Sequence, residues 1–150
     1  MLTMKQALGI ATSAVAEAQK SGMAPISVAV LDRGAHVLAL LRDERASLGR
    51  PEIALAKAAG CLAMGFGGRE LARRAERMPQ FFTALATVLP QGMVPLPGGV
   101  LIRDASGEIL GAVGVSGDTS ENDEKCAVAG ISAQALVADT GAVQAREGQP

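Results

Sequence analysis

Lys57 stands in an otherwise apolar helical row, and its surroundings point to chemistry more strongly than those of any other residue. Its neighbours at helical spacing are Ile53, Gly60, Cys61 and Met64. Burial lowers the pKa of an amine because the charged form loses its hydration, and a neutral amine can act as a base or a nucleophile. A charged amine in the same place would anchor an anion. The alternative is a lysine whose stem crosses the apolar face and brings the ammonium to water.

A second group of candidates lies where a glycine-rich strand runs into a helix, in the segment GAVGVSGDTSENDEK. Glycines recur there at every third position: Gly111, Gly114 and Gly117. Glycine weakens a strand unless a ligand or another chain segment must approach its backbone closely. The helix start offers N–H groups to an anion, but its acidic residues oppose that use, and we interpret Ser120 with Asp123 as a capping box. Glu124 begins the buried row of this helix, so its carboxylate can point into a pocket at the sheet edge.

His36 and Arg42 flank the strand that we expect at residues 36–41. His36 is the only histidine in the chain, and beside a chain reversal an imidazole is more commonly a hydrogen-bonded surface group than a ligand. Arg42 ends the strand, where a guanidinium suits the recognition of a carboxylate. A basic row farther along is interpreted as a solvated helix face: Arg69, Arg73 and Arg77.

Composition narrows the function classes. Apolar residues make up 49% of the chain, Trp and Tyr are absent, and the formal net charge is −1. Such a chain lacks the stacking platforms and the basic footprint of nucleic-acid-binding proteins. No apolar run reaches the roughly 20 residues of a membrane span, and the N-terminus lacks the pattern of a signal peptide. Cys61 and Cys126 form neither a CxxC motif nor a Cys/His cluster, so we expect no metal site and a reducing, cytoplasmic location.

The elements that must position these residues follow from periodicity and turn chemistry. Helices are expected at residues 4–20, 51–66 and 69–77, with a turn or two within 79–89 and a last helix from Thr119 or Ser120 to about 139. Strand–turn–strand patterns predict two hairpins, at residues 26–41 and 99–116. This order indicates one α+β domain over residues 1–150, with an antiparallel sheet of four or five strands covered by helices.

Two segments need a further remark. The helix over residues 53–66 is apolar on nearly every side, which predicts that it is buried in the core or between subunits. Residues 142–150 are expected to be irregular.

The segments ISVAVLDRGAHVLALLR and PGGVLIRD…GEILGAVGVSGDTSENDEKCAVAGI, separated by an alanine-rich helix with a central lysine, resemble the GlcG/HbpS-like family. This family includes the haem-binding HbpS and the C-terminal domain of PduO-type proteins. The similarity covers residues 26–138. It implies a profilin/roadblock-like fold, with a five-stranded antiparallel sheet between helices, and assembly into dimers or larger rings, commonly octamers. It also marks a set of motif residues: His36, Arg42, Lys57, Gly98, Gly99 and Glu124.

The resemblance further implies a ligand. Several members are linked to haem or another tetrapyrrole, and others are encoded beside catabolic enzymes for small acids or aromatics. In PduO-like domains the resemblance points to a histidine in the first helix as the haem ligand, whereas residues 4–20 of this chain contain none.

The leading hypothesis is therefore a small-molecule-binding domain for a carboxylated metabolite or a tetrapyrrole such as haem. The ligand would lie in a cleft between the second hairpin, the Lys57 helix and the last helix, near a subunit boundary. Arg42 and Lys57 would hold carboxylate or propionate groups. Gly98 and Gly99 would let the ligand approach the backbone, and Glu124 would orient a polar atom.

The alternative hypothesis is a cofactor-independent lyase or isomerase that acts on a small oxygenated catabolic intermediate, aromatic or oxo acid. Its acid–base groups would be Lys57, His36 and Glu124, with Arg42 stabilising an enolate or phenolate. A third possibility, an assembly module without a ligand, gives no reason for a lysine in an apolar row. Under the binding or catalytic hypotheses, replacing Lys57 by Met should leave folding intact and abolish binding or turnover.

Overall fold

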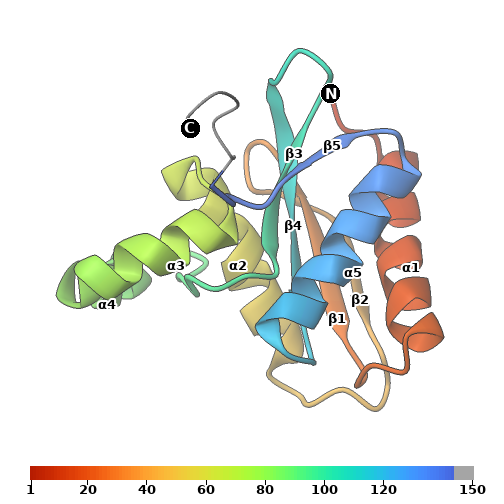
Figure 1. Ribbon diagram of the computed structural model, residues 1–150, viewed down its shortest axis with the longest axis horizontal. Coiled ribbons are helices and arrows are strands. Elements are labelled where there is room, and N and C mark those ends of the chain that lie inside the picture. Colours follow the sequence, from red (N-terminus) through yellow and green to blue (C-terminus); the bar gives the residue numbers. More distant parts are fainter. Residues whose placement is uncertain (144–150) are drawn as a thin grey trace, which may run out of the picture.

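A computed structural model describes residues 1–143, in which a five-stranded antiparallel sheet lies between two groups of helices (Figure 1). The strands are β1 (Ser27–Asp32), β2 (Val37–Arg42), β3 (Gly99–Arg103), β4 (Ile109–Ser116) and β5 (Val137–Asp139), in the order β2-β1-β4-β3-β5. The helices are α1 (Met4–Lys20), α2 (Arg50–Met64), α3 (Gly68–Arg77), α4 (Pro79–Val88) and α5 (Ser120–Ala133). The expected α+β class with a five-stranded antiparallel sheet is confirmed. Most of the segment expected to be irregular, residues 144–150, lies outside the described residues.

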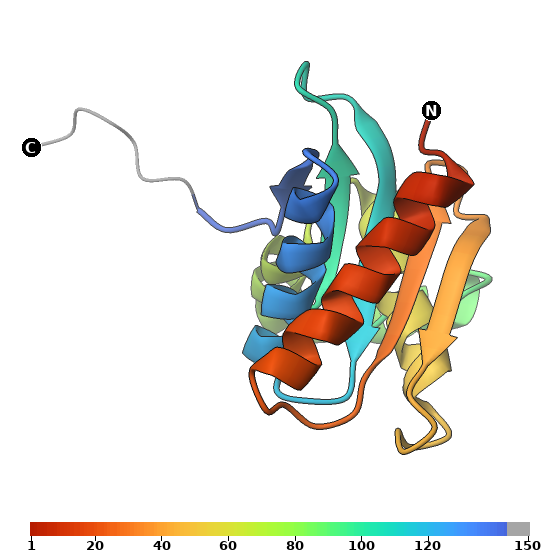
Figure 2. The same ribbon diagram turned by 90° about the vertical axis from the view of Figure 1, so that its right-hand side faces the viewer.

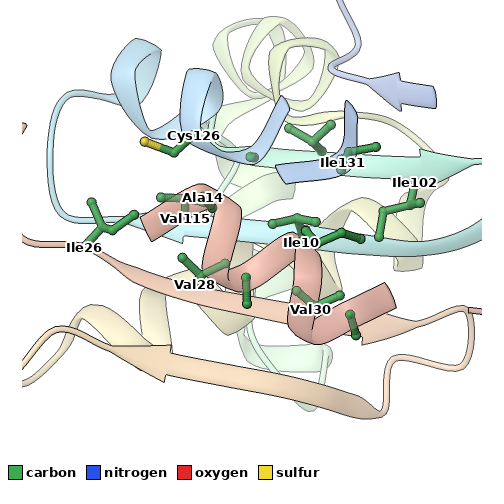
Figure 3. Close-up of a cluster of buried hydrophobic side chains, with 14 of the residues drawn as sticks. Ile10, Ala14, Ile26, Val28, Val30, Ile102, Val115, Cys126 and Ile131 are labelled. Atoms are coloured by element: carbon green, nitrogen blue, oxygen red, sulfur yellow. The ribbon is translucent and has the colours of Figure 1, made fainter. Parts of the chain in front are cut away.

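Helices α1 and α5 lie side by side on one face of the sheet (Figure 2). Thr3 begins α1 with a capping box, because its hydroxyl accepts from the Gln6 N–H at 3.1 Å and the Gln6 side chain accepts from the Thr3 N–H at 3.0 Å. Aliphatic side chains from both helices and the sheet form the first core cluster (Figure 3). At Gly130 a Cβ would lie 2.4 Å from the Ile10 carbonyl oxygen, so glycine lets the two helices meet backbone to backbone.

Helix α2 covers the opposite face, with α3 and α4 beyond it (Figure 1). This contact explains Gly114 of β4, whereas at Gly111 a Cβ would lie 2.1 Å from the Leu31 carbonyl oxygen of β1. At Gly114 a Cβ would lie 1.9 Å from the carbonyl oxygen of Ala54 in α2, so the segment that approaches this strand is a helix of the chain itself. The apolar helix expected over residues 53–66 is thus buried in the core of the chain.

The structure corrects the end of the last helix. Helix α5 stops at Ala133, not near residue 139, and β5 follows and pairs antiparallel with β3. The chain reverses at Ala135, which has a left-handed φ of 55°. Alanine favours helix and rarely adopts this conformation, so residue type gives no sign of the break. The segment after residue 79 is also a complete ten-residue helix, α4, where only a turn or two was expected.

Within residues 1–143 no helix combines the length and apolar character needed to cross a membrane.

Candidate functional site

Lys57 lies buried at the centre of α2, where its amine is fully engaged. Its side chain is 3% exposed, and Nζ donates to the Val115 carbonyl oxygen at 3.0 Å and to Oδ2 of Asp123 at 3.2 Å. The Asp123 side chain is 2% exposed, and its Oδ1 accepts from the Asp118 N–H at 2.9 Å. This buried ion pair ties α2 to the end of β4 and to the first turn of α5.

The protonation of this pair is set by two opposing influences. Burial lowers the pKa of the Lys57 ammonium, and the Asp123 carboxylate opposes that shift. Burial raises the pKa of the Asp123 carboxyl, while the Asp118 N–H and the Lys57 charge lower it. Because both groups are enclosed and hydrogen-bonded to each other, Lys57 acts here as a positioning group and does not face solvent as a base.

Gly98 and Gly99 pack against the same lysine. Gly98 has a φ of +108°, and a Cβ there would lie 2.9 Å from Lys57 Nζ and 2.8 Å from the Val115 carbonyl oxygen. At Gly99 a Cβ would lie 2.7 Å from the Lys57 carbonyl oxygen and 2.8 Å from Cys61 Sγ. The close approach expected of a ligand at these two glycines is made in this structure by α2.

Glu124 pairs with Arg69, the second residue of α3. The guanidinium donates to Oε1 from Nε at 3.0 Å and from Nη2 at 2.8 Å, and the side chains are 36% and 12% exposed for Arg69 and Glu124. Oε2 also lies close to Nε, but it is buried and accepts no hydrogen bond in residues 1–143. Arg69 therefore belongs to this polar cluster, and its interpretation as part of a solvated helix face is wrong.

The capping box expected between Ser120 and Asp123 does not form, so that prediction is wrong. The N-cap of α5 is Thr119, whose hydroxyl accepts from the Asn122 N–H at 3.2 Å. Asp123 turns inward instead. A signal for this was available, because Asp123 precedes Ala127 and Gly130 by one and two helical turns and so starts the buried row of small residues.

The structure leaves Arg42 outside this cluster. At the end of β2 its Nη1 donates to the carbonyl oxygens of Asp43, Glu44 and Ala46 at 3.2, 3.3 and 3.1 Å, which holds the loop that leads to α2. The arginine that does approach the lysine is Arg50, which also donates from Nη1 to the Ser116 hydroxyl at 3.1 Å.

Comparisons with known proteins now decide the family. The family model described as haem degrading protein HbpS-like matches residues 2–132. The chain belongs to the HbpS-like family. This confirms the GlcG/HbpS-like resemblance. No match was found among curated protein sequences.

Solved structures agree with this membership. A complex of PduOC with haem is 25% identical, with a TM-score of 0.80 over 91% of this chain and 96% of that chain. HbpS is 32% identical, with a TM-score of 0.75 over 87% and 88% of the two chains. A Klebsiella pneumoniae protein, ORFY, is 26% identical, with a TM-score of 0.77 over 89% and 90%.

In this HbpS-like chain the only histidine is far from Lys57. His36 follows β1, at the end of the sheet opposite to the Ser27–Ser116 pair, and β1 from Ser27 to Asp32 is roughly 17 Å long. The imidazole is 82% exposed, and its Nδ1 lies 3.3 Å from the Asp32 carboxylate. The structure therefore brings together Lys57, Gly98 and Gly99. Glu124 directly follows Asp123, the ion-pair partner of Lys57, whereas His36 lies at the other end of the sheet.

Two clefts flank the turn that carries His36. One, of about 440 Å³, lies between this turn, α2 and the loop before β3, and Ala59, Leu62 and Leu89 contribute to its walls. The other, of about 400 Å³, lies between the turn, the N-terminus and the β3–β4 turn. Both volumes are in the range of small-molecule sites.

Proposed function

We propose that this HbpS-like chain binds a tetrapyrrole, with haem as the leading candidate. The observation that carries this proposal is the similarity over 91% of the chain to PduOC, whose solved structure is a haem complex. The description of the matching family as haem degrading points to the same ligand class.

The clefts beside His36 supply what such a ligand requires. A macrocycle needs apolar walls, its propionates need cations, and its iron needs an axial ligand. The 440 Å³ cleft combines aliphatic walls with Arg33 and His36. The described residues hold no cluster of three or more His, Cys, Asp or Glu side chains suited to a free metal ion, so metal would enter with the macrocycle.

Titration with hemin is expected to show saturable binding near one haem per chain, with a sharpened and shifted Soret band. The shift arises because a protein cleft separates haem from its aggregates and supplies an axial ligand. Absorbance around the Soret maximum measures this shift, and hemin mixed with an unrelated protein of similar size in the same buffer is the control. A Soret band that matches the control at stoichiometric protein would refute the proposal.

A second candidate ligand is a carboxylated metabolite, favoured by the Arg69–Glu124 pair. The Arg69 guanidinium is 36% exposed, and Oε2 of Glu124 is buried 2.8 Å from Nε of Arg69 without a well-aligned hydrogen bond within residues 1–143. A ligand could pair its carboxylate with Arg69 and donate to Glu124. In this second proposal Arg69, and not Arg42, pairs with the ligand carboxylate. The ion pair of Lys57 with Asp123 holds α5 in place.

The expected result for this second candidate is that pyruvate or benzoate, used as probes, binds the wild type and not the Arg69→Gln variant. NMR line broadening of the probe measures binding, and Arg77→Gln, on the exposed end of α3, is the matched control. Binding that survives Arg69→Gln would exclude this site. The same spectra test the lyase or isomerase hypothesis, since turnover would produce new probe signals.

We also propose self-association, because apolar groups remain exposed at two places. Helix α4 projects from the sheet and carries Phe81, 48% exposed, and Val88, 74% exposed (Figure 1). On the edge strand β2, Leu40 is 42% exposed beside unpaired backbone groups.

Light scattering should report a mass above that of one chain. Phe81→Glu should lower this mass, and the control Thr83→Glu should leave it unchanged. A wild type with the mass of one chain would contradict the proposal.

A further inference from the structure

The turn between β1 and β2 holds His36 in a defined orientation. The Asp32 carboxylate accepts from the backbone N–H groups of Gly34 at 2.8 Å and His36 at 3.0 Å, and it lies 3.3 Å from the imidazole Nδ1. At Gly34 a Cβ would lie 3.0 Å from both Nδ1 and Cε1 of the ring. A side chain at position 34 would crowd the imidazole, which rests against the glycine backbone.

This arrangement prepares one ring nitrogen for a metal. A histidine that binds a metal commonly donates its other N–H to a carboxylate, which fixes the tautomer and the ring orientation. The Asp32 carboxylate lies 3.3 Å from Nδ1, where it favours the tautomer with the proton on that nitrogen. Nε2 then carries the lone pair, and it makes no hydrogen bond within residues 1–143.

One of the clefts that His36 lines suits a flat apolar ligand with acidic groups. His36 lines the 440 Å³ cleft, whose aliphatic wall is formed by Ala59, Leu62, Ala63, Leu89 and Pro90. Arg33 lies at the same cleft and pairs with Glu108 at 3.3 Å, with side-chain exposures of 74% and 63%. A pair so open to water is weak, so its guanidinium is available to a propionate.

We propose that haem would be held in this cleft, with Nε2 of His36 supplying a ligand to its iron. Asp32 acts as the positioning residue through Nδ1, and Arg33 pairs with a propionate. This inference rests on the proposed haem binding and adds the ligand and the place, at the hairpin turn and not on α1.

The test compares hemin with protoporphyrin IX, which lacks iron, on the wild type and on His36→Ala. The wild type should bind both, and its hemin complex should show an imidazole-ligated absorption and EPR spectrum. His36→Ala should lose this signature and bind hemin more weakly, while its affinity for protoporphyrin IX stays within about twofold, a difference of about 0.4 kcal/mol. Added imidazole should restore the signature by entering the vacated place.

Two further variants separate orientation from space. Asp32→Asn should weaken hemin binding by about tenfold or more and leave protoporphyrin IX unaffected, as expected for a group that orients the metal ligand. Ala63→Trp should fill the cleft and weaken the binding of both compounds. Ala63 and His36 are exposed, so variants at these positions should fold, and circular dichroism checks this.

The outcomes distinguish this inference from the proposed function. If the wild type binds hemin and His36→Ala keeps the same imidazole-type spectrum, the inference is wrong and haem binding stands. If Ala63→Trp changes neither affinity, the cleft is wrong as well. A wild type that binds neither hemin nor protoporphyrin IX would overturn the proposed function and the inference with it.

Discussion

Replacing Lys57 by Met is expected to lower the free energy of unfolding by about 3–5 kcal/mol, the cost of breaking a buried ion pair by removing one partner. The variant leaves the Asp123 carboxylate 2% exposed without its cation and removes the donor from the Val115 carbonyl oxygen. The sequence alone suggested that this variant would fold normally, and the ion pair reverses that expectation. Urea denaturation followed by circular dichroism measures the change.

Two controls sharpen this result. Lys57→Met combined with Asp123→Leu removes both charges, so stability should recover in part, with about 1–3 kcal/mol still lost because the Asp118 N–H keeps no acceptor. Lys125→Met removes an exposed lysine of α5 and should stay within about 0.5 kcal/mol of the wild type. A single variant as stable as the wild type would show that the pair contributes nothing to the fold.

Replacing Gly114 by Ala should cost about 3 kcal/mol or more, at the upper end of what overpacking a core costs. The added methyl would lie 1.9 Å from the Ala54 carbonyl oxygen and 2.9 Å from the Ala58 nitrogen. Both are backbone atoms of α2 and cannot rotate away, so the whole helix must move off the sheet. The midpoint of urea denaturation measures the loss.

Gly49→Ala is the matched control for this variant. Nothing lies within 4 Å of a Cβ at that position, and its φ of −84° is open to any residue. Its effect should be about 1 kcal/mol, because alanine is a poorer N-cap than glycine. If Gly114→Ala is equally mild, α2 does not pack on β4 as closely as described.

Since α2 also forms one wall of the 440 Å³ cleft, Gly114→Ala should weaken hemin binding too.

Local chemistry made much of the fold predictable. Asp32 and Asp104 each begin a turn by accepting backbone N–H groups two and four residues later, so both hairpins could be inferred from an aspartate and a nearby glycine. Strand β5 could not, because the reversal at Ala135 uses a residue that favours helix. Its pairing with β3 is a long-range contact that no local pattern encodes.

The candidate site, like the fold, was predictable only in part. The apolar row around Lys57 left two interpretations open, a buried amine or one that reaches water, and the structure shows the buried one. Its partner could not be predicted, because an acidic residue in the first turn of a helix suits a cap as well as an ion pair. Arg69 is 55 residues from Glu124, and a sequence offers no spacing rule for contacts of that kind.

The Lys57–Asp123 pair also bears on the order in which the chain assembles. It joins residues 66 apart, and the Asp118 carboxylate next to it accepts from the Ala24 N–H, 94 residues away, at 2.7 Å. Closing such long loops costs entropy before any contact repays it, so we expect these bonds to form after the folding transition state. Loss of the pair should then accelerate unfolding while the folding rate changes little. Lys57 is thus expected to govern how long the native chain persists more than how quickly it arises.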